Sequence, residues 1–320
     1  MPIEPNNATP EAAGPAYLQW LDAAALAKLH RLELVARGVV AGFISGRHRS
    51  PYRGFSVEFA EHREYVPGDD IGDLDWKVYG KTDRYYVKQY IEETNLRATI
   101  LLDASGSMAY AGDRAAPHGG RRLRKFDYAR YLAASLGHLL IHQQDAVGLV
   151  TFDTRIRRYL PARSRPTHLR VLLDELHALQ PGAETAIAPI FHEVAERVHR
   201  RGLIIVISDL FDDPAEVLKG LHHFRFRKHE VIVLHVMADE ELTFPFERWS
   251  LFKDLERGDH ELELDPQAVR AAYLDEMRRF LAAIEKGCGE MHIDYVPLCT
   301  RQDFDLALAG YLANRQNMAG

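Results

Sequence analysis

Cysteine and long apolar runs are scarce in this chain, and both shortages bear on where it works. The 320 residues include only two cysteines, Cys288 and Cys299, which are too few for a disulfide framework and lack C-x-x-C metal spacing. The longest apolar stretches, 203–207 and 231–237, fall far short of the roughly 20 residues that cross a bilayer. The N-terminus has neither the basic start nor the apolar core of a secretory signal. We therefore expect a cytoplasmic protein with no membrane partner.

An excess of positive charge is also missing. Acidic residues number 46 against 40 basic ones, a net charge of −6, which argues against nucleic acid as the main partner. Hydrophobic residues make up 47% and charged residues 27% of the chain, as in ordinary globular proteins, so wholesale disorder is excluded. The length predicts about two domains, or one large α/β domain with an appendage.

The first 95 residues differ from the rest in composition. Residues 1–16 are rich in Pro, Ala and Asn, and we expect them to form a disordered tail. Residues 17–95 predict an N-terminal helix, with apolar residues every three or four positions from Leu18 to Val39, and then a small β-rich arm. The β-like pieces of this arm lie at 55–59 and 85–91. The arm is too short and polar to bury its own core, so we expect it to dock on the next domain.

Residues 96–316 alternate between short apolar strands and amphipathic helices. Strands are predicted at 98–102, 147–152, 203–208, 231–236 and 292–296, with a possible hairpin partner at 156–160. Asp-Pro pairs at 213–214 and 265–266 predict helix starts, because Asp is a good N-cap and Pro suits the first turn. This pattern predicts an α/β fold, a doubly wound and mostly parallel sheet with helices on both faces. Residues 242–265 interrupt the pattern and are interpreted as an insertion or long connection.

Oxygen-bearing side chains follow the first predicted strand of this region. Asp103, Ser105 and Ser107 lie in a turn directly after it, and ligands of open α/β sheets bind beyond the carboxyl ends of strands. Hard cations such as Mg²⁺ prefer oxygen ligands. The D-x-S-x-S spacing is not specific by itself, because a turn that caps a helix can have the same residues.

Two later residues strengthen the cation hypothesis. Thr185 lies in a loop before a predicted helix, and Asp209 follows the strand 203–208. If the strands are parallel, Asp209 reaches the same sheet edge as Asp103. Taken singly, Thr185 is explained as an N-cap and Asp209 as a turn residue. Together the three loops place five oxygen side chains at one edge.

With these five residues the chain resembles the von Willebrand factor A domain, whose metal-ion-dependent adhesion site reads D-x-S-x-S…T…D. The resemblance implies a site for Mg²⁺ or Mn²⁺ that Ser105 and Ser107 contact directly. It also implies that Thr185 contacts the metal in one conformational state. Asp103 and Asp209 would act largely through water.

A second resemblance lies upstream. Residues 45–50, 58–70 and 75–77 look like the signature of a bacterial family known as domain of unknown function 58, in which the signature precedes an A-domain. Genes of that family commonly lie beside a MoxR-type AAA+ ATPase, and the family is thought to serve as its adaptor. Many members carry transmembrane helices, whereas this sequence shows none, and the loop 110–124 is longer than usual.

The resemblance implies a non-enzymatic, divalent-cation-dependent protein-binding module, an adaptor or regulator of such an ATPase in protein maturation or complex assembly. An acidic residue of the ATPase or its client would complete the site. The competing hypotheses are a metal-dependent phosphohydrolase that uses the same strand-end site and a scaffold without metal. Binding is favoured because no His lies within residues 103–107, and Ser105 stands where a haloacid dehalogenase needs a second Asp.

Three other patterns are given ordinary interpretations. Residues 80–82, Gly-Lys-Thr, resemble the end of a P-loop, but Asp75 stands where the earlier glycine is required. His138 and His142 lack the Glu of H-E-x-x-H. The basic run 121–125 is interpreted as a solvated face, with electrostatic steering of an acidic partner as the alternative.

Overall fold

A computed structural model describes residues 21, 57–66, 75–92, 96–118, 121–182, 184, 186–256 and 261–319. The chain divides into two compact units, one of residues Ile44–Asn95 and one that includes Leu96–Gly320, and each is described by itself. The expected N-terminal tail and, apart from Leu21, the expected N-terminal helix lie outside the described residues.

The smaller unit contains a hairpin and a short helix. Strands β1 (Val57–Glu64) and β2 (Tyr86–Glu92) pair antiparallel, with an irregularity between Phe59 and Glu61. The predicted piece 85–91 is confirmed, whereas only residues 57–59 of the predicted piece 55–59 are described, and the strand extends five residues beyond it. Helix α3 (Trp76–Thr82) lies between them and was not predicted. The Gly-Lys-Thr tripeptide ends this helix, whereas a P-loop precedes one, so its position argues against nucleotide binding.

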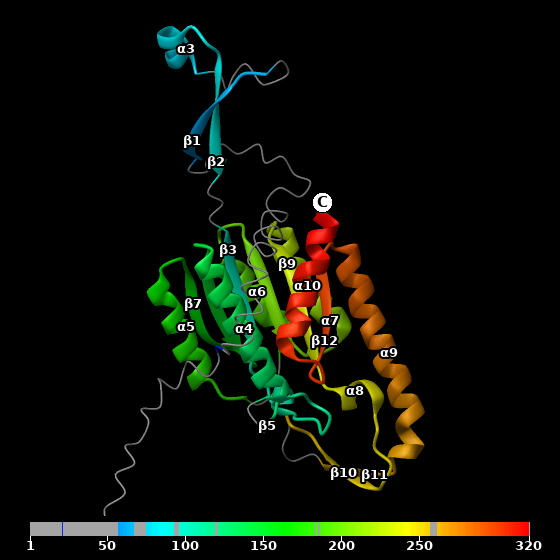
Figure 1. The fold of residues 1–320 in the computed structure, drawn as a ribbon. Coiled ribbons are helices and arrows are strands. Elements are labelled where there is room, and N and C mark those ends of the chain that lie inside the picture. Colours follow the sequence, from blue (N-terminus) through cyan, green and yellow to red (C-terminus); the bar gives the residue numbers. More distant parts are fainter. Residues whose placement is uncertain are drawn as a thin grey trace, which may run out of the picture. The chain divides into compact units, whose positions relative to one another are not determined.

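The larger unit is built on a six-stranded sheet with the order β12-β9-β8-β3-β6-β7 (Figure 1). The first five strands are mutually parallel, and β7 pairs antiparallel with β6 at one edge. This mostly parallel sheet, including the hairpin, was predicted. Its strands are β3 (Arg97–Asp103), β6 (Ala146–Phe152), β7 (Ile156–Arg163), β8 (Leu203–Ser208), β9 (Glu230–Met237) and β12 (Asp294–Cys299).

Helices cover both faces of the sheet, as expected for strands that are buried on both sides. Helix α4 (Lys125–His142) packs on β3 and β6, with α5 (Pro166–Ala178) and α10 (Phe304–Ala319) beside it. On the other face, α7 (Pro214–Phe226) lies between α6 (Ile187–Arg197) and α9 (Pro266–Glu290). Phe191, Phe224 and Ile284 from these three helices belong to one core cluster with the sheet.

Both Asp-Pro helix starts are confirmed. Asp213 accepts a hydrogen bond from the N–H of Ala215 at 2.7 Å, and Asp265 accepts one from the N–H of Gln267 at 3.0 Å. Each carboxylate therefore satisfies a backbone donor that the first helical turn leaves free.

The structure adds elements that were not predicted. Helix α5 begins with Pro166 and buries Leu172, Leu173 and Leu176. The region interpreted as a long connection contains a hairpin of β10 (Ser250–Lys253) and β11 (Glu261–Leu264). The remaining short elements are the 3-10 helix η3 (Ser107–Ala109), strands β4 (Pro117–His118) and β5 (Arg121–Arg122), and helix α8 (Asp239–Thr243). Within the described residues, no helix combines the length and apolar character needed to cross a membrane.

Candidate functional site

The candidate site lies beside the central strand, at the point where the order in which the chain adds strands to the sheet reverses. From the central strand β3 the chain continues to β6 on one side and later returns to β8 on the other. Asp103 is the last residue of β3, and Asp209 follows the last residue of β8. Because β3 and β8 are neighbouring parallel strands, both carboxylates emerge at one edge, at the switch point where α/β sheets bind ligands.

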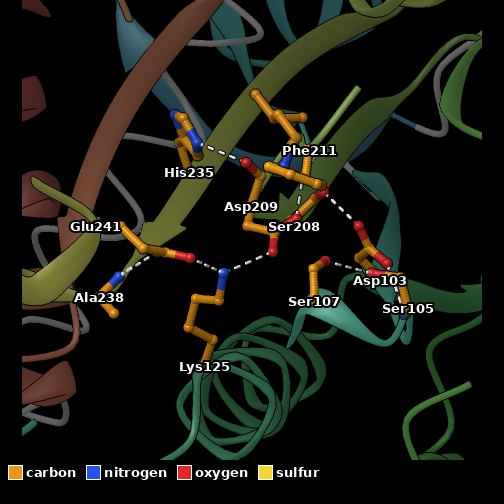
Figure 2. A network of polar contacts seen from close by, with 11 residues as sticks. Asp103, Ser105, Ser107, Lys125, Ser208, Asp209, Phe211, His235, Ala238 and Glu241 are labelled. Atoms are coloured by element: carbon orange, nitrogen blue, oxygen red, sulfur yellow. Dashed lines mark hydrogen bonds and ion pairs between the residues drawn. The ribbon is translucent and has the colours of Figure 1, made fainter. Parts of the chain in front are cut away.

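Asp103 is fully buried and held by hydrogen bonds to both of its oxygens (Figure 2). The N–H of Ser105 donates to Oδ1 at 2.9 Å, and the hydroxyl of Ser208 donates to Oδ2 at 2.5 Å. Burial and the nearby charge of Asp209 raise the pKa of Asp103 to about 7, and the hydrogen bonds from Ser208 and Ser105 oppose this rise. The carboxylate is thus fixed in orientation but costly to keep charged.

The hydroxyls of Ser105 and Ser107 lie 3.1 Å apart beside this carboxylate. Two ligands at neighbouring octahedral positions, each about 2.1 Å from Mg²⁺, are separated by about 3.0 Å. The serine pair therefore fits two coordination positions of one small divalent cation. Both side chains are already buried, so cation binding costs little further desolvation of these hydroxyls.

Asp209 is paired with a buried lysine. The Nζ atom of Lys125 lies 2.7 Å from Oδ2 of Asp209 and 2.5 Å from Oε1 of Glu241, and the lysine side chain is only 2% exposed. Burial would raise the pKa of Asp209, but the charge of Lys125 and hydrogen bonds from Lys125 and Ser107 outweigh it and leave this pKa lowered. Burial opposes the charged lysine, while Asp209 and Glu241 raise the pKa of Lys125. Both partners are therefore charged at neutral pH.

The basic run 121–125 was interpreted as a solvated face, and this interpretation is wrong for Lys125 because that residue is buried. Arg122 pairs with Asp113 at 2.6 Å, and Arg124 pairs with Asp127 at 2.7 Å. Only tertiary packing distinguishes the buried lysine from these neighbours.

Two further contacts fix the backbone around Asp209. The N–H of Phe211 donates to Oδ1 of Asp209 at 3.3 Å, and Nε2 of His235 lies 2.8 Å from the Asp209 carbonyl oxygen. Burial lowers the pKa of His235 to about 4, so its ring is neutral. Because a carbonyl only accepts, Nε2 donates, and Nδ1 accepts from the Tyr295 hydroxyl at 2.7 Å. Sequence reasoning missed His235, since a buried histidine on a strand carries no local signal.

Thr185 lies outside the described residues, so its predicted role in the site stays a prediction. Described residues on either side of it are hydrogen-bonded to the loops that carry the carboxylates. The N–H of Gly182 donates to the carbonyl of Ala104 at 2.5 Å, and the N–H of Ile187 donates to Asp212 at 3.2 Å.

The structure thus brings together Asp103, Ser105, Ser107 and Asp209, and adds Lys125, Ser208, His235 and Glu241 around them. In the described part of the chain, this site included, no three His, Cys, Asp or Glu side chains are grouped so that they could hold a metal ion. The rings of His138 and His142 are 5.9 Å apart on α4.

Comparison with known proteins gives the family. The family described as "Protein of unknown function DUF58" matches residues 61–282, which is more than half of the chain. The chain belongs to this family. The resemblance seen in the upstream residues is therefore confirmed at the level of the family, whose description assigns no function.

Two relatives and two solved structures that are similar to this chain share between 19% and 26% sequence identity with it. The chain is 26% identical over 301 residues to the uncharacterized protein Mb1516 of Mycobacterium bovis and to the uncharacterized protein Rv1480 of Mycobacterium tuberculosis, covering 92% of this chain and 90% of each relative. An aerotolerance-related membrane protein from Bacteroides fragilis matches with a TM-score of 0.47 and 19% identity, covering 70% of this chain and 99% of that one. BatB from Bacteroides thetaiotaomicron matches with a TM-score of 0.45 and 20% identity, covering 69% and 99%.

Proposed function

We propose that this DUF58 protein is a non-enzymatic protein-binding module of the von Willebrand factor A type, and that its binding depends on Mg²⁺ or Mn²⁺. The observation that carries the proposal is the serine hydroxyl pair, 3.1 Å apart, between the two carboxylates at the switch point of the sheet. Ser105 and Ser107 would hold the ion directly. Asp103 and Asp209, with Thr185, would complete the set.

The hydrogen bonds of the carboxylates favour binding over hydrolysis. Both oxygens of Asp103 already accept hydrogen bonds, so this residue is poorly placed to act as a nucleophile. Asp209 is held by Lys125 and by the N–H of Phe211, which leaves it poorly available as a general base. Neutral hydroxyl ligands leave a bound cation strongly electrophilic, and a carboxylate from another protein can complete its coordination.

For the partner we propose a MoxR-type AAA+ ATPase or its client, met in the cytoplasm through an acidic residue. This part of the proposal is supported by the upstream residues 45–50, 58–70 and 75–77, whose resemblance to the family signature led to it. No single contact in the described residues carries it.

Titration calorimetry with Mg²⁺ and Mn²⁺ tests the cation site. We expect one site in the wild type and at least about tenfold weaker binding in Ser105→Ala, which removes one ligand hydroxyl together with its hydrogen bond to Ser107. Ser164→Ala is the matched control, because Ser164 is exposed and lies at the opposite edge of the sheet from the candidate site. It follows Arg163, the end of β7 that pairs with the start of β6. Unchanged affinity in Ser105→Ala would contradict the proposed site.

Two assays separate the proposed function from its alternatives. A purified MoxR-type ATPase should bind the wild type in Mg²⁺ and be released by chelator. The phosphohydrolase hypothesis instead predicts turnover of p-nitrophenyl phosphate that rises with Mg²⁺ and disappears in Asp209→Ala. We expect no such turnover, and its observation would replace the binding proposal.

A further inference from the structure

Phe211 is an exposed aromatic side chain directly beside the candidate cation site. The residue is 63% exposed, while its backbone N–H donates to Asp209 (Figure 2). The preceding Leu210 is fully buried and has a φ of 52°, in the left-handed region that residues other than glycine rarely adopt. This backbone conformation places Leu210 in the core while the next side chain faces solvent.

The loop that carries Phe211 is hydrogen-bonded to the starts of two helices. Asp212 accepts from the N–H of Ile187, the first residue of α6, and also from the N–H of Asp213 at 2.8 Å. Asp213 in turn caps α7 through the N–H of Ala215. An aromatic side chain on such a fixed loop has little conformational freedom to lose on binding, which favours its use as a contact.

We infer that Phe211 is the apolar anchor of the partner-binding surface, and that the bound segment presents a carboxylate with an apolar side chain within two residues of it. The inference rests on the proposed function and adds to it the chemistry of the residues next to the acid. Neighbouring residues of an extended segment are about 3.3 to 3.6 Å apart. A side chain one or two positions from the carboxylate is therefore the one that reaches an anchor adjacent to Asp209.

Charge and burial at the site favour this occupant. The charge of Asp209 is offset by Lys125, and the oxygens of Asp103 face protein donors. A cation bound to the neutral serine hydroxyls would not be neutralised by them. Its positive charge would face solvent, where it favours a carboxylate of the partner. Aromatic side chains at the centre of interfaces contribute a large share of the binding energy when an apolar partner covers them, and a polar segment would leave Phe211 exposed to water.

The test uses three five-residue peptides with blocked ends: aspartate between two leucines, aspartate between two serines, and asparagine between two leucines. Their binding to Mg²⁺-loaded protein is measured by NMR titration for the wild type, Phe211→Ala and Phe226→Ala. Phe226 is a matched control, because it is 77% exposed but ends α7, about 18 Å along the helix from its start. Metal affinity is measured separately for each protein without peptide.

We expect the wild type and Phe226→Ala to bind the leucine-flanked aspartate at least about fivefold more tightly than the serine-flanked one. The asparagine peptide should not bind. In Phe211→Ala the two aspartate peptides should bind equally, while metal affinity stays unchanged. The inference is overturned if Phe211→Ala still binds the leucine-flanked aspartate more tightly than the serine-flanked one. It is also overturned if the metal-loaded wild type binds the two aspartate peptides equally, or binds neither of them. Failure of the proposed function is distinct, since the wild type would then take up no metal in the titration without peptide.

Discussion

The ammonium of Lys125 lies 2.7 Å from a carboxylate oxygen of Asp209, and both side chains are buried at the carboxyl edge of the sheet. A buried ion pair of this kind compensates two charges that would each be costly alone. Because Glu241 also accepts from this lysine, the pair links the loop after β8 to helix α8. Its consequence is that Asp209 stays charged and fixed in orientation before any ligand arrives.

Removal of this lysine should be strongly destabilising. Lys125→Met keeps much of the side-chain volume but leaves Asp209 buried without its counter-charge, and we expect a loss of about 3 to 5 kcal/mol in the free energy of unfolding. Urea denaturation measures it. Lys219→Met is the control, since Lys219 forms an exposed pair with Glu216 and should cost less than about 1 kcal/mol. Similar losses in both variants would show that the buried pair has no special role.

Cation binding should stabilise the folded chain. At a free Mg²⁺ concentration 100 times the Kd, a single site adds about 2.7 kcal/mol to the free energy of unfolding. We expect this gain in the wild type and its loss in Ser107→Ala at the same Mg²⁺ concentration. Denaturation with and without chelator measures it. An equal gain in both proteins would place the stabilising ion elsewhere.

Asp145 should make stability fall as pH rises. This buried residue accepts from the N–H of Leu96 at 3.0 Å, and burial raises its pKa to about 7. Between about pH 4 and pH 7 the folded chain therefore binds more protons than the unfolded chain, so the free energy of unfolding decreases with pH. Asp145→Asn retains the acceptor without a charge to bury.

We expect Asp145→Asn to exceed the wild type in unfolding free energy by about 1 to 3 kcal/mol at pH 8. The difference should vanish near pH 4. Denaturation at a series of pH values measures it, and Asp174→Asn, at an exposed position of α5, should change stability by less than about 0.5 kcal/mol throughout. A variant less stable than the wild type at pH 8 would refute this account of Asp145.

Two glycines should respond to alanine in opposite directions. A Cβ at Gly148 of β6 would lie 2.7 Å from the carbonyl oxygen of Leu160 and 2.9 Å from the N of Ala162, where the register of β6 and β7 is irregular. Gly148→Ala should cost about 1 to 3 kcal/mol, since the obstructing atoms are backbone. In α4, Gly137→Ala meets nothing closer than 3.8 Å and should gain about 0.5 to 1 kcal/mol. Thermal denaturation of both variants checks the signs.

Much of the sheet was predictable because its signals are local. Strand β8 has the predicted bounds, and all six of its residues are buried, so an apolar run between polar segments identified it. The Asp-Pro pairs marked two helix starts for the same reason. Helix α5 was equally predictable in principle, since its buried leucines have helical spacing. Helix α3 was not, because seven residues that include Gly80 and Thr82 have weak helix propensity.

The sequence by itself determined the parallel sheet, most of its helices and the edge at which Asp103, Ser105, Ser107 and Asp209 meet. Periodicity and strand ends carry that information within short windows. Only the tertiary structure decided that Lys125, of the four basic residues in the run 121–125, is the buried ion-pair partner of Asp209. Lys125 meets Asp209 and Glu241 across 84 and 116 residues of chain. Such a pairing depends on how helix α4, the loop after β8 and helix α8 pack at one sheet edge. Burial, and not residue type, makes each of these charges costly without its partner.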